Sequence, residues 1–321
     1  MLDQEFLFSK LTVEERLQYL ADHSPLSSDE LAAIHAGSAL SIGIAEKMVE
    51  NCIGTYSLPY CVAPGFLING KELSVPMVGE EPYVPSSTSK GALIAKKNGG
   101  FTATNTGSIM IGQVQLSDIS NPYTAKLRVL ENKGRLIEAA NQVDPVLVSF
   151  GGGCMDVEAY VRDSSRETYL SVHLIVDVKD AMGAQALNAM CEAVAPMLEE
   201  ITGGKANLKV LSNLAVHRLV RSHVTIAKED VGGEANVDKI VSAWRFACCD
   251  QFRAATHNKG IMNGIIPVVV ATGNDTRAVE SGVHSYACYH GNYRPVTTWE
   301  KNTSGDLEGM IEIPLAVGIV G

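Results

Sequence analysis

The order of strand and helix patterns between residues 108 and 213 constrains the fold of this chain most strongly. Four segments have the composition of strands: residues 109–116, 155–161, 168–178 and 208–211. Two helical patterns lie between them, one beginning at Asn121-Pro122, where proline suits the first helical position, and one beginning near Asp180. The resulting order, β-α-β-β-α-β, predicts a ferredoxin-like domain.

RNA-recognition domains share this architecture, so a binding module is one alternative. Such a module needs aromatic and basic side chains on its central strands. The third strand here contains Tyr169-Leu-Ser-Val-His-Leu-Ile-Val, with one aromatic and no Lys or Arg, and the chain has a formal net charge of -10. Both observations argue against a nucleic-acid partner.

The regions on either side of this domain have a mixed α/β pattern. Two capping-box sequences, Thr12-Val-Glu-Glu15 and Ser27-Ser-Asp-Glu30, predict helices within residues 9–50. Asn69-Gly70 lies between two apolar runs and predicts a β-hairpin with a type I′ turn. Further helices are expected over 42–51, 86–98, 237–252 and 275–289, and a pair of strands over 296–299 and 309–313.

The stretch from 253 to 280 concentrates the side chains that could carry chemistry. We expect an apolar strand over 265–271, because this run is rich in β-branched residues. A glycine-flanked loop before the strand would carry Arg253, Lys259 and Asn263, and a helix would open at Asp275 after it. Polar groups beside a buried strand are a common arrangement at active sites.

The bulk composition limits the class of protein. The chain has 321 residues, of which 46% are hydrophobic and 19% charged, as in ordinary globular proteins. No apolar run approaches the roughly 18 residues of a membrane helix, and the first residues lack the pattern of a signal peptide, so we expect a cytoplasmic protein without a membrane partner. The seven cysteines are scattered without a CxxC pair, which argues against a disulfide framework or a metal site.

Several residues have both a chemical and an ordinary interpretation. Lys259 could stabilise an oxyanion or be a solvated surface lysine. Asp275 could act on that lysine or simply cap a helix. Glu81 could be a general acid or half of an exposed pair with Glu80. Asp180-Ala-Met-Gly183 could bind phosphate at a helix N-terminus or begin an unremarkable capped helix.

Taken together, these motifs make the chain resemble the class II, bacterial-type hydroxymethylglutaryl-CoA reductases. The matching stretches, in chain order, are Glu50-Asn-Cys-Ile-Gly54, Met77-Val-Gly-Glu-Glu-Pro82, Lys97-Asn-Gly-Gly-Phe101, Gly151-Gly-Gly-Cys154, Asp180-Ala-Met-Gly-Ala184, Leu211-Ser-Asn-Leu214, His257-Asn-Lys-Gly-Ile-Met-Asn-Gly264, Ala271-Thr-Gly-Asn-Asp275 and Thr297-Thr-Trp-Glu-Lys301. They extend over nearly the whole chain.

The resemblance implies an α+β protein with a large mixed α/β domain that binds acyl-CoA. That domain would comprise residues 1–107 and 214–321, and the inserted ferredoxin-like domain, 108–213, would bind NAD(P). The resemblance also implies an obligate homodimer, or a higher assembly of dimers, with active sites at the subunit interface in which the segment 50–54 takes part. The reaction would interconvert hydroxymethylglutaryl-CoA and mevalonate plus CoA by two hydride transfers, through mevaldehyde.

The resemblance also assigns roles to individual residues. Lys259 would be the oxyanion stabiliser, Glu81 the proton donor and acceptor, and Asp275 the group that tunes both. The remaining assignments are Arg253 and Asn263 for the substrate, and Asp144, Asp180, Met182, Gly183 and Asn213 for the dinucleotide. The carboxylate of Asp144 would favour NAD, with NADP possible, because it repels a 2′-phosphate.

Three departures from the family pattern leave an alternative open. Tyr83 follows Glu-Glu-Pro where a serine is usual, and Gln185 stands where asparagine is usual. The family also continues after the Val-Gly-Ile-Val-Gly stretch with a helical domain that carries a histidine acting on the CoA thiolate, and no histidine here lies in that motif. The alternative is a truncated, non-catalytic protein that binds acyl-CoA or a dinucleotide.

Overall fold

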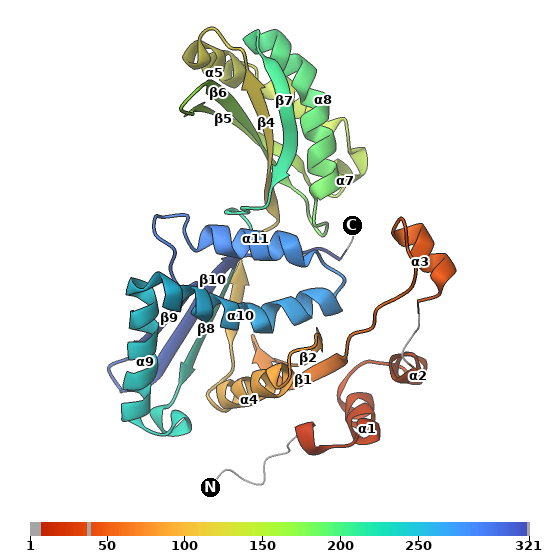
Figure 1. Cartoon of the computed structure of the whole chain (residues 1–321), viewed down its shortest axis with the longest axis vertical. Helices are drawn as coiled ribbons and strands as arrows, with labels where there is room; N and C mark the ends of the chain where they lie inside the picture. The colour runs from red at the N-terminus through yellow and green to blue at the C-terminus, as the bar shows by residue number, and fades with distance from the viewer. Residues whose placement is uncertain (1–7, 37–39, 320–321) are drawn as a thin grey trace. The chain divides into compact units, whose positions relative to one another are not determined.

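The computed structural model describes residues 8–36 and 40–319 and divides into two compact units (Figure 1). One unit comprises the described residues up to Phe101 together with Asn263–Thr272, and the other comprises Thr102–Met262 and the residues from Gly273 onward. The predicted inserted domain, 108–213, lies wholly within the second unit. The domain limits expected from the sequence stay a prediction.

The first unit begins with the helices that the capping boxes predict. A short 3-10 helix, Phe8–Lys10, precedes α1 (Val13–His23), α2 (Ser28–Ala36) and α3 (Ile42–Met48). Thr12 N donates to the Glu15 carboxylate at 2.7 Å, and Glu15 N donates to Thr12 Oγ1 at 3.2 Å, which completes the first capping box. The equivalent reciprocal pair joins Ser27 and Glu30. Helix α3 is three residues shorter than expected, because Val49 is extended.

The predicted hairpin follows in the same unit. Strands β1 (Tyr60–Ile68) and β2 (Lys71–Val78) are antiparallel, and Asn69 and Gly70 have φ values of 51° and 78°, as a type I′ turn requires. Helix α4 (Val84–Lys97) packs on β1, where the buried hydroxyl of Ser89 donates to Pro64 O at 2.8 Å.

The second unit contains the β-α-β-β-α-β arrangement. Strands β4 (Ile109–Ser117), β5 (Gly153–Asp163), β6 (Thr168–Asp177) and β7 (Lys205–Ser212) form an antiparallel sheet in the order β5-β6-β4-β7. Helices α5 (Pro122–Glu131) and α8 (Ala184–Thr202) are the two predicted crossovers, and α6 (Lys133–Asn141) and α7 (Pro145–Ser149) are short additions before β5.

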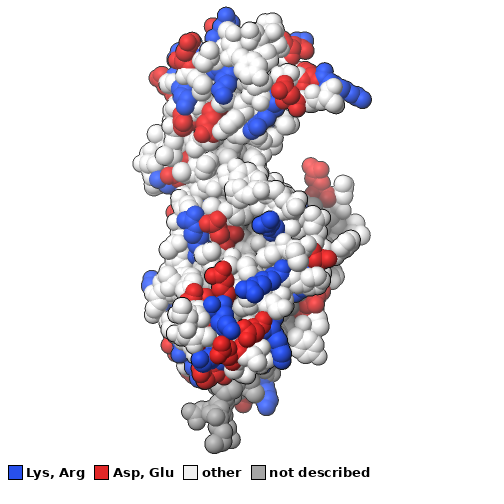
Figure 2. Space-filling view, turned by 90° about the vertical axis from the view of Figure 1, so that its left-hand side faces the viewer, with Lys and Arg blue, Asp and Glu red and all other residues white. Residues whose placement is uncertain are grey.

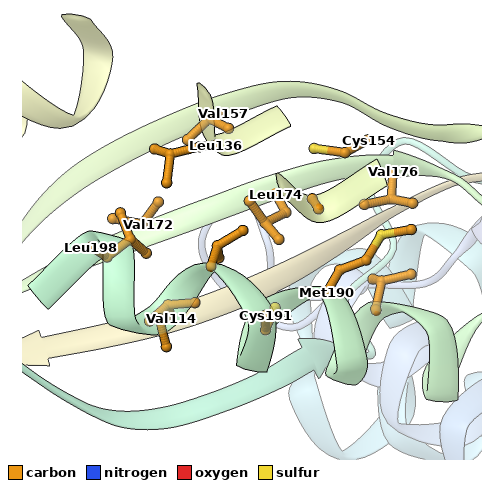
Figure 3. Close-up of a cluster of buried hydrophobic side chains, with 14 of the residues drawn as sticks. Val114, Leu136, Cys154, Val157, Val172, Leu174, Val176, Met190, Cys191 and Leu198 are labelled. Carbon is orange, nitrogen blue, oxygen red and sulfur yellow. The ribbon is translucent and has the colours of Figure 1, made fainter. Parts of the chain in front are cut away.

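One face of this sheet is sealed by a hydrophobic core (Figure 3). The buried members of β6 alternate along the strand as Val172, Leu174 and Val176, and they meet Met190 and Leu198 of α8. Every second residue of the strand is buried, and the buried residues of α8 have helical spacing. Both patterns are those that the sequence predicts. The core therefore holds the helices on this face of the sheet, and the ends of the strands lie outside it.

A second sheet in this unit has the order β3-β8-β10-β9. Its antiparallel strands are β3 (Thr102–Asn105), β8 (Leu219–Ile226), β10 (Leu307–Pro314) and β9 (Thr297–Lys301). The expected pairing of the last two strands is confirmed. The remaining elements are the 3-10 helix Lys228–Val231, α9 (Glu234–Cys249) and α11 (Thr276–Tyr286).

The expected strand over 265–271, with a loop before it, is wrong. Residues 251–271 form one helix, α10 (Gln251–Ala271), which contributes residues to both units. β-Branched runs of this length suit either a strand or a buried helix, and periodicity alone does not separate the two. Packing decides in favour of the helix, although Gly260 and Gly264 each cost about 1 kcal/mol relative to alanine. Asn258 and Met262 are almost fully buried.

The face drawn in Figure 2 carries Lys and Arg side chains interspersed with Asp and Glu. No broad basic area lies on that face, whereas a nucleic-acid surface would concentrate positive charge. In the part of the chain that the structure describes, no helix is long and apolar enough to cross a membrane.

Candidate functional site

Helix α10 presents Lys259 on its exposed side. The neighbouring side chains point toward the second sheet: His257 Nε2 lies 2.7 Å from Thr297 Oγ1, and Asn258 Nδ2 donates to Arg294 O at 2.9 Å. Val296 N donates to Asn258 Oδ1 at 3.1 Å, so both ends of this buried amide are satisfied. These contacts fix the rotation of the helix about its axis. Lys259 is exposed on this helix, and not in a glycine-flanked loop as expected.

The two predicted substrate residues also lie on α10. Asn263 is four residues after Lys259, so both side chains project from one face of the helix. Arg253 lies in the first turn and is half-buried; its N–H donates to Asp250 Oδ1 at 2.7 Å. Burial, and then the charge of Arg253, lower the pKa of His257, which favours a neutral imidazole near pH 7.

Glu81 belongs to the first unit. It is exposed and lies between the end of β2 and α4, next to Tyr83, the N-cap of α4, whose φ of 68° is left-handed. Two residues before Glu81, a Cβ on Gly79 would lie 3.7 Å from Cγ of Pro267 in α10. The end of β2 therefore lies against the C-terminal half of α10. Lys259 belongs to the other unit, and its meeting with Glu81 stays a prediction.

Asp275 is the N-cap of α11, as its ordinary interpretation predicts. Its Oδ1 accepts the N–H groups of Arg277 and Ala278 at 2.9 and 3.2 Å. The guanidinium of Arg277 adds bonds of 3.0 Å to Oδ1 and 3.1 Å to Oδ2. Arg277 is the main cause that lowers the pKa of Asp275, so this carboxylate is ionised near neutral pH. Oδ2 makes fewer of these bonds and keeps capacity for another donor.

The predicted dinucleotide residues gather at one edge of the β5-β6-β4-β7 sheet (the small sheet), the edge formed by the ends of its strands. Strands β6 and β7 both end where β4 begins, since Asp177 pairs with Ile109 and Ser212 pairs with Ile111. Asn213 follows β7 directly, and the segment Asp180–Gly183 follows β6. The topology therefore brings to the same edge two stretches that are about 30 positions apart in the sequence, and to which the resemblance assigns the same ligand.

The helix expected near Asp180 begins slightly later. Gly183 is the N-cap of α8, with φ 94°, and a Cβ at this position would lie 2.6 Å from Cγ1 of Val178. Glycine is therefore required by both conformation and space. Asp180 is exposed and Met182 is half-buried. The first turn of α8 places backbone N–H groups at this edge, the usual arrangement for binding an anion.

Asp144 reaches the same edge through α7. Its carboxylate accepts Leu147 N at 2.9 Å and so caps α7. Leu147 packs against Gly152, at which a Cβ would lie 2.7 Å from both Leu147 Cδ1 and Asp177 O. The helix that carries Asp144 thus adjoins the end of β6. The role of Asp144 in choosing between NAD and NADP stays a prediction.

Three further residues at this edge escaped the sequence analysis. Lys179 has a left-handed φ of 52°, and its ammonium lies 2.9 Å from Asp177 Oδ2. Arg218 donates from Nη1 to the carbonyls of Ala181 and Met182. Gly318 lies against the peptide bond between those two residues. Lys179 could have been found from the sequence, because it directly precedes Asp180. Arg218 and Gly318 are remote from Asp180 in the sequence, and no local pattern points to them.

Comparisons with known proteins identify the family. The family model of hydroxymethylglutaryl-coenzyme A reductase matches residues 12–321. The chain is also 52% identical, over 314 residues, to the 3-hydroxy-3-methylglutaryl-coenzyme A reductase of Archaeoglobus fulgidus, a match that covers 98% of this chain and 72% of that protein. The chain belongs to the hydroxymethylglutaryl-coenzyme A reductase family.

Other members of the reductase family extend the comparison. A probable reductase of Borreliella burgdorferi is 34% identical over 285 residues, which cover 86% of this chain and 63% of that protein. The structure of the Streptococcus pneumoniae reductase has a TM-score of 0.95 and 38% identity, covering 98% of this chain and 76% of that one. A class II reductase of the same organism, bound to NADPH in open conformations, has a TM-score of 0.94. The predicted resemblance to class II enzymes and the mixed α and β fold are confirmed.

The departures from the family pattern have definite places in the structure. Tyr83 is exposed and left-handed at the start of α4, where Ser86 Oγ donates to its carbonyl at 3.0 Å. Gln185 is exposed in the first turn of α8. Both positions lie beside segments to which the resemblance assigns ligand contacts.

Proposed function

We propose that this reductase interconverts hydroxymethylglutaryl-CoA and mevalonate plus CoA, using a nicotinamide dinucleotide for two successive hydride transfers through mevaldehyde. The observation that carries the proposal is the gathering of Asp144, Asp180–Gly183 and Asn213 at one edge of the small sheet, in a chain that belongs to this family. In the reductive direction each hydride adds to a carbonyl carbon, and the carbonyl oxygen gains negative charge and then a proton.

Lys259 would stabilise that developing oxyanion. Its ammonium projects from the exposed side of α10, whose rotation is fixed by the buried Asn258 and by His257. A fixed positive charge stabilises the charged transition state without having to reorganise during the reaction. Arg253 and Asn263, on the same helix, are assigned to contacts with the anionic substrate.

Glu81 would supply and accept the protons, and Asp275 would tune Lys259. Asp275 is held ionised by Arg277, and its Oδ2 retains capacity for a lysine ammonium. An ionised carboxylate beside an ammonium favours the protonated lysine that oxyanion stabilisation needs. Glu81 is exposed on the loop after β2, where a carboxyl group can exchange protons with a substrate.

We propose NAD as the preferred dinucleotide, with NADP accepted less well. The Asp144 carboxylate uses one oxygen to cap α7. Its other oxygen would accept a ribose hydroxyl, whereas a 2′-phosphate would be repelled by its charge. A related Streptococcus pneumoniae enzyme binds NADPH, so the preference of this chain needs its own measurement.

The family resemblance further suggests a homodimer in which residues 50–54 take part. Several apolar side chains in and around this segment are exposed in the isolated chain: Ile42, Ile44, Met48, Val49 and Ile53. Exposed apolar side chains concentrated in one segment are typical of protein–protein interfaces. A second copy of the chain is the proposed partner.

The test is an assay of the full-length enzyme in both directions, with NAD and NADP in parallel. We expect CoA-dependent reduction of the dinucleotide with mevalonate, and its oxidation with hydroxymethylglutaryl-CoA. Lys259→Ala should lower kcat by about 10²–10³-fold without unfolding the protein. Lys239→Ala, at another exposed helical lysine, is the matched control and should be unaffected. A wild-type enzyme that binds the ligands without turnover would support the non-catalytic alternative.

A further inference from the structure

Arg218 is the one buried charged residue among the residues that the structure describes. It precedes β8 and is 7% exposed. Burying a guanidinium is costly unless its N–H groups are hydrogen-bonded. Here Nη1 donates to Ala181 O at 3.1 Å and to Met182 O at 3.3 Å, while Nη2 donates to Val317 O. The acceptors are carbonyl oxygens, and two of them belong to the segment assigned to the dinucleotide.

The geometry of the peptide bond gives these contacts a consequence. In a trans peptide the carbonyl of one residue and the N–H of the next point in opposite directions. Because Ala181 O and Met182 O point toward the buried guanidinium, the N–H groups of Met182 and Gly183 point away from it. Gly183 is the N-cap of α8 and Met182 precedes it, so these two N–H groups lie just before the first turn of the helix, beside the place where an anion would bind.

A second set of contacts to the same segment comes from Gly318 and Ile319, near the end of the described chain. A Cβ on Gly318 would lie 2.3 Å from Met182 N and 2.6 Å from the carbonyl carbon of Ala181. Ile319 N donates to Asp180 O at 2.9 Å. Gly318 N donates to Asn274 Oδ1 at 2.8 Å, so these residues also contact the neighbour of Asp275.

We propose that Arg218 is a positioning residue for dinucleotide binding. It holds the carbonyls of Ala181 and Met182, and so directs the N–H groups of Met182 and Gly183 toward the cofactor's pyrophosphate. Gly318 is the second part of this support, because only glycine lets the chain lie against the 181–182 peptide bond. Arg218 does not contact the cofactor itself. The proposal rests on the proposed function, since it assumes that a dinucleotide binds at this edge.

The test compares Arg218→Met and Arg218→Lys with wild type in the full-length enzyme. Binding of NADH is measured directly by fluorescence or calorimetry, and KM is measured separately for NADH and for hydroxymethylglutaryl-CoA. Both variants should weaken NADH binding by about 10-fold or more, because hydrogen bonds to a charged group are lost. Lysine keeps the charge but cannot span three carbonyls in the fixed fork of arginine. The KM for hydroxymethylglutaryl-CoA should stay within about twofold of wild type, a split that general destabilisation would not produce.

Leu136→Ala is the matched control, since it weakens the core of the same domain away from this edge. It should lower Tm and leave NADH affinity unchanged. Gly318→Ala provides an independent variant should the Arg218 changes prevent folding, and it should weaken NADH binding in the same way.

Folded Arg218 variants or Gly318→Ala with wild-type NADH affinity would overturn the inference. The proposed function has a separate criterion. A wild-type enzyme that binds NADH without turnover would refute the proposed reaction, while the Arg218 variants would still test the positioning role by binding alone. A wild-type enzyme that binds no dinucleotide would overturn both.

Discussion

Asp275 has a structural role that the structure shows and a chemical role that we propose. Its Oδ1 caps α11, and its Oδ2 accepts a bond from Arg277. The sequence pattern Gly-Asn-Asp before a helix predicted the cap correctly, because capping depends on neighbouring backbone groups. The arginine two residues later was not predicted as its partner. The position of Asp275 relative to Lys259 depends on the fold, and sequence spacing carries no information about it.

Replacing Asp275 with asparagine separates these two roles. Asparagine is an equally good N-cap, and an exposed ion pair such as that with Arg277 contributes only about 0–1 kcal/mol, so Tm should change little. The negative charge that we propose to tune Lys259 is lost, and kcat should fall by roughly 10²-fold or more. Thermal unfolding and steady-state kinetics measure the two effects. Asp250→Asn, at the aspartate that accepts the Arg253 N–H, is the control with a capping role only. A wild-type kcat in Asp275→Asn would leave Asp275 as a cap.

At the scale of elements, local chemistry predicted much of the fold. The capping boxes, the Asn69-Gly70 turn and the alternating strands of the small sheet were all recovered, because each depends on residues that are close in sequence. Helix α10 was missed for the opposite reason. Its β-branched run favoured a strand, and the contacts that make it a helix come from residues far along the chain, including Arg294 and Val296.

The two hydrogen bonds of the buried Asn258 amide are tertiary contacts that orient α10. Asn258→Ala would remove the side-chain amide and leave its two partners, the carbonyl of Arg294 and the N–H of Val296, unsatisfied in a buried place. We expect a loss of about 1–3 kcal/mol in the free energy of unfolding, measured by urea denaturation. Because the helix rotation is less well fixed, kcat should fall with it. Thr256→Ala, at an exposed position on the same helix, should change neither quantity; equal effects of the two substitutions would contradict the prediction.

His173 gives the small sheet a specific dependence on pH. Burial is the first cause that lowers its pKa, the charge of Arg162 adds to this, and Glu158 opposes it. The unfolded chain, with an ordinary histidine pKa of about 6.5, therefore binds a proton more readily than the folded one. Stability from this group is complete above pH ~6.5 and is lost as pH falls through the lower, folded pKa.

His173→Gln should reduce this loss of stability in acid. Glutamine retains a polar group near Gln113 Nε2 and Ser171 Oγ, which lie 3.0 and 3.1 Å from His173 Nε2. Tm measured from pH 7.5 to 5 should fall less steeply in the variant than in wild type. His223→Gln, at an exposed histidine with ordinary solvent contact, is the control and should leave the slope unchanged. A steeper slope in His173→Gln would show that the sign is wrong.

At the scale of the whole molecule, the exposed apolar residues around α3 form the surface at which we propose that a second copy binds. Ile44 is 53% exposed, Met48 is 67% exposed, and Ile53 in the segment 50–54 is fully exposed. In a twofold dimer each substitution occurs twice in the interface, so one charged side chain per chain is doubly costly. The sequence motif predicted that this segment takes part in assembly, but only the structure shows how much apolar surface surrounds it.

Ile44→Asp should therefore convert the dimer into a monomer. An unpaired charge buried in an interface costs about 2–5 kcal/mol, and two copies should raise the dimer Kd by several orders of magnitude. Sedimentation velocity across a range of protein concentrations measures this change. Turnover should fall with the dimer fraction, since the segment 50–54 is expected to complete the active site of the other copy. Leu127→Asp, at an exposed apolar residue of α5 in the second unit, is the control and should keep the mass and turnover of wild type. A monomeric wild-type enzyme with full activity would contradict both the assembly and the shared site.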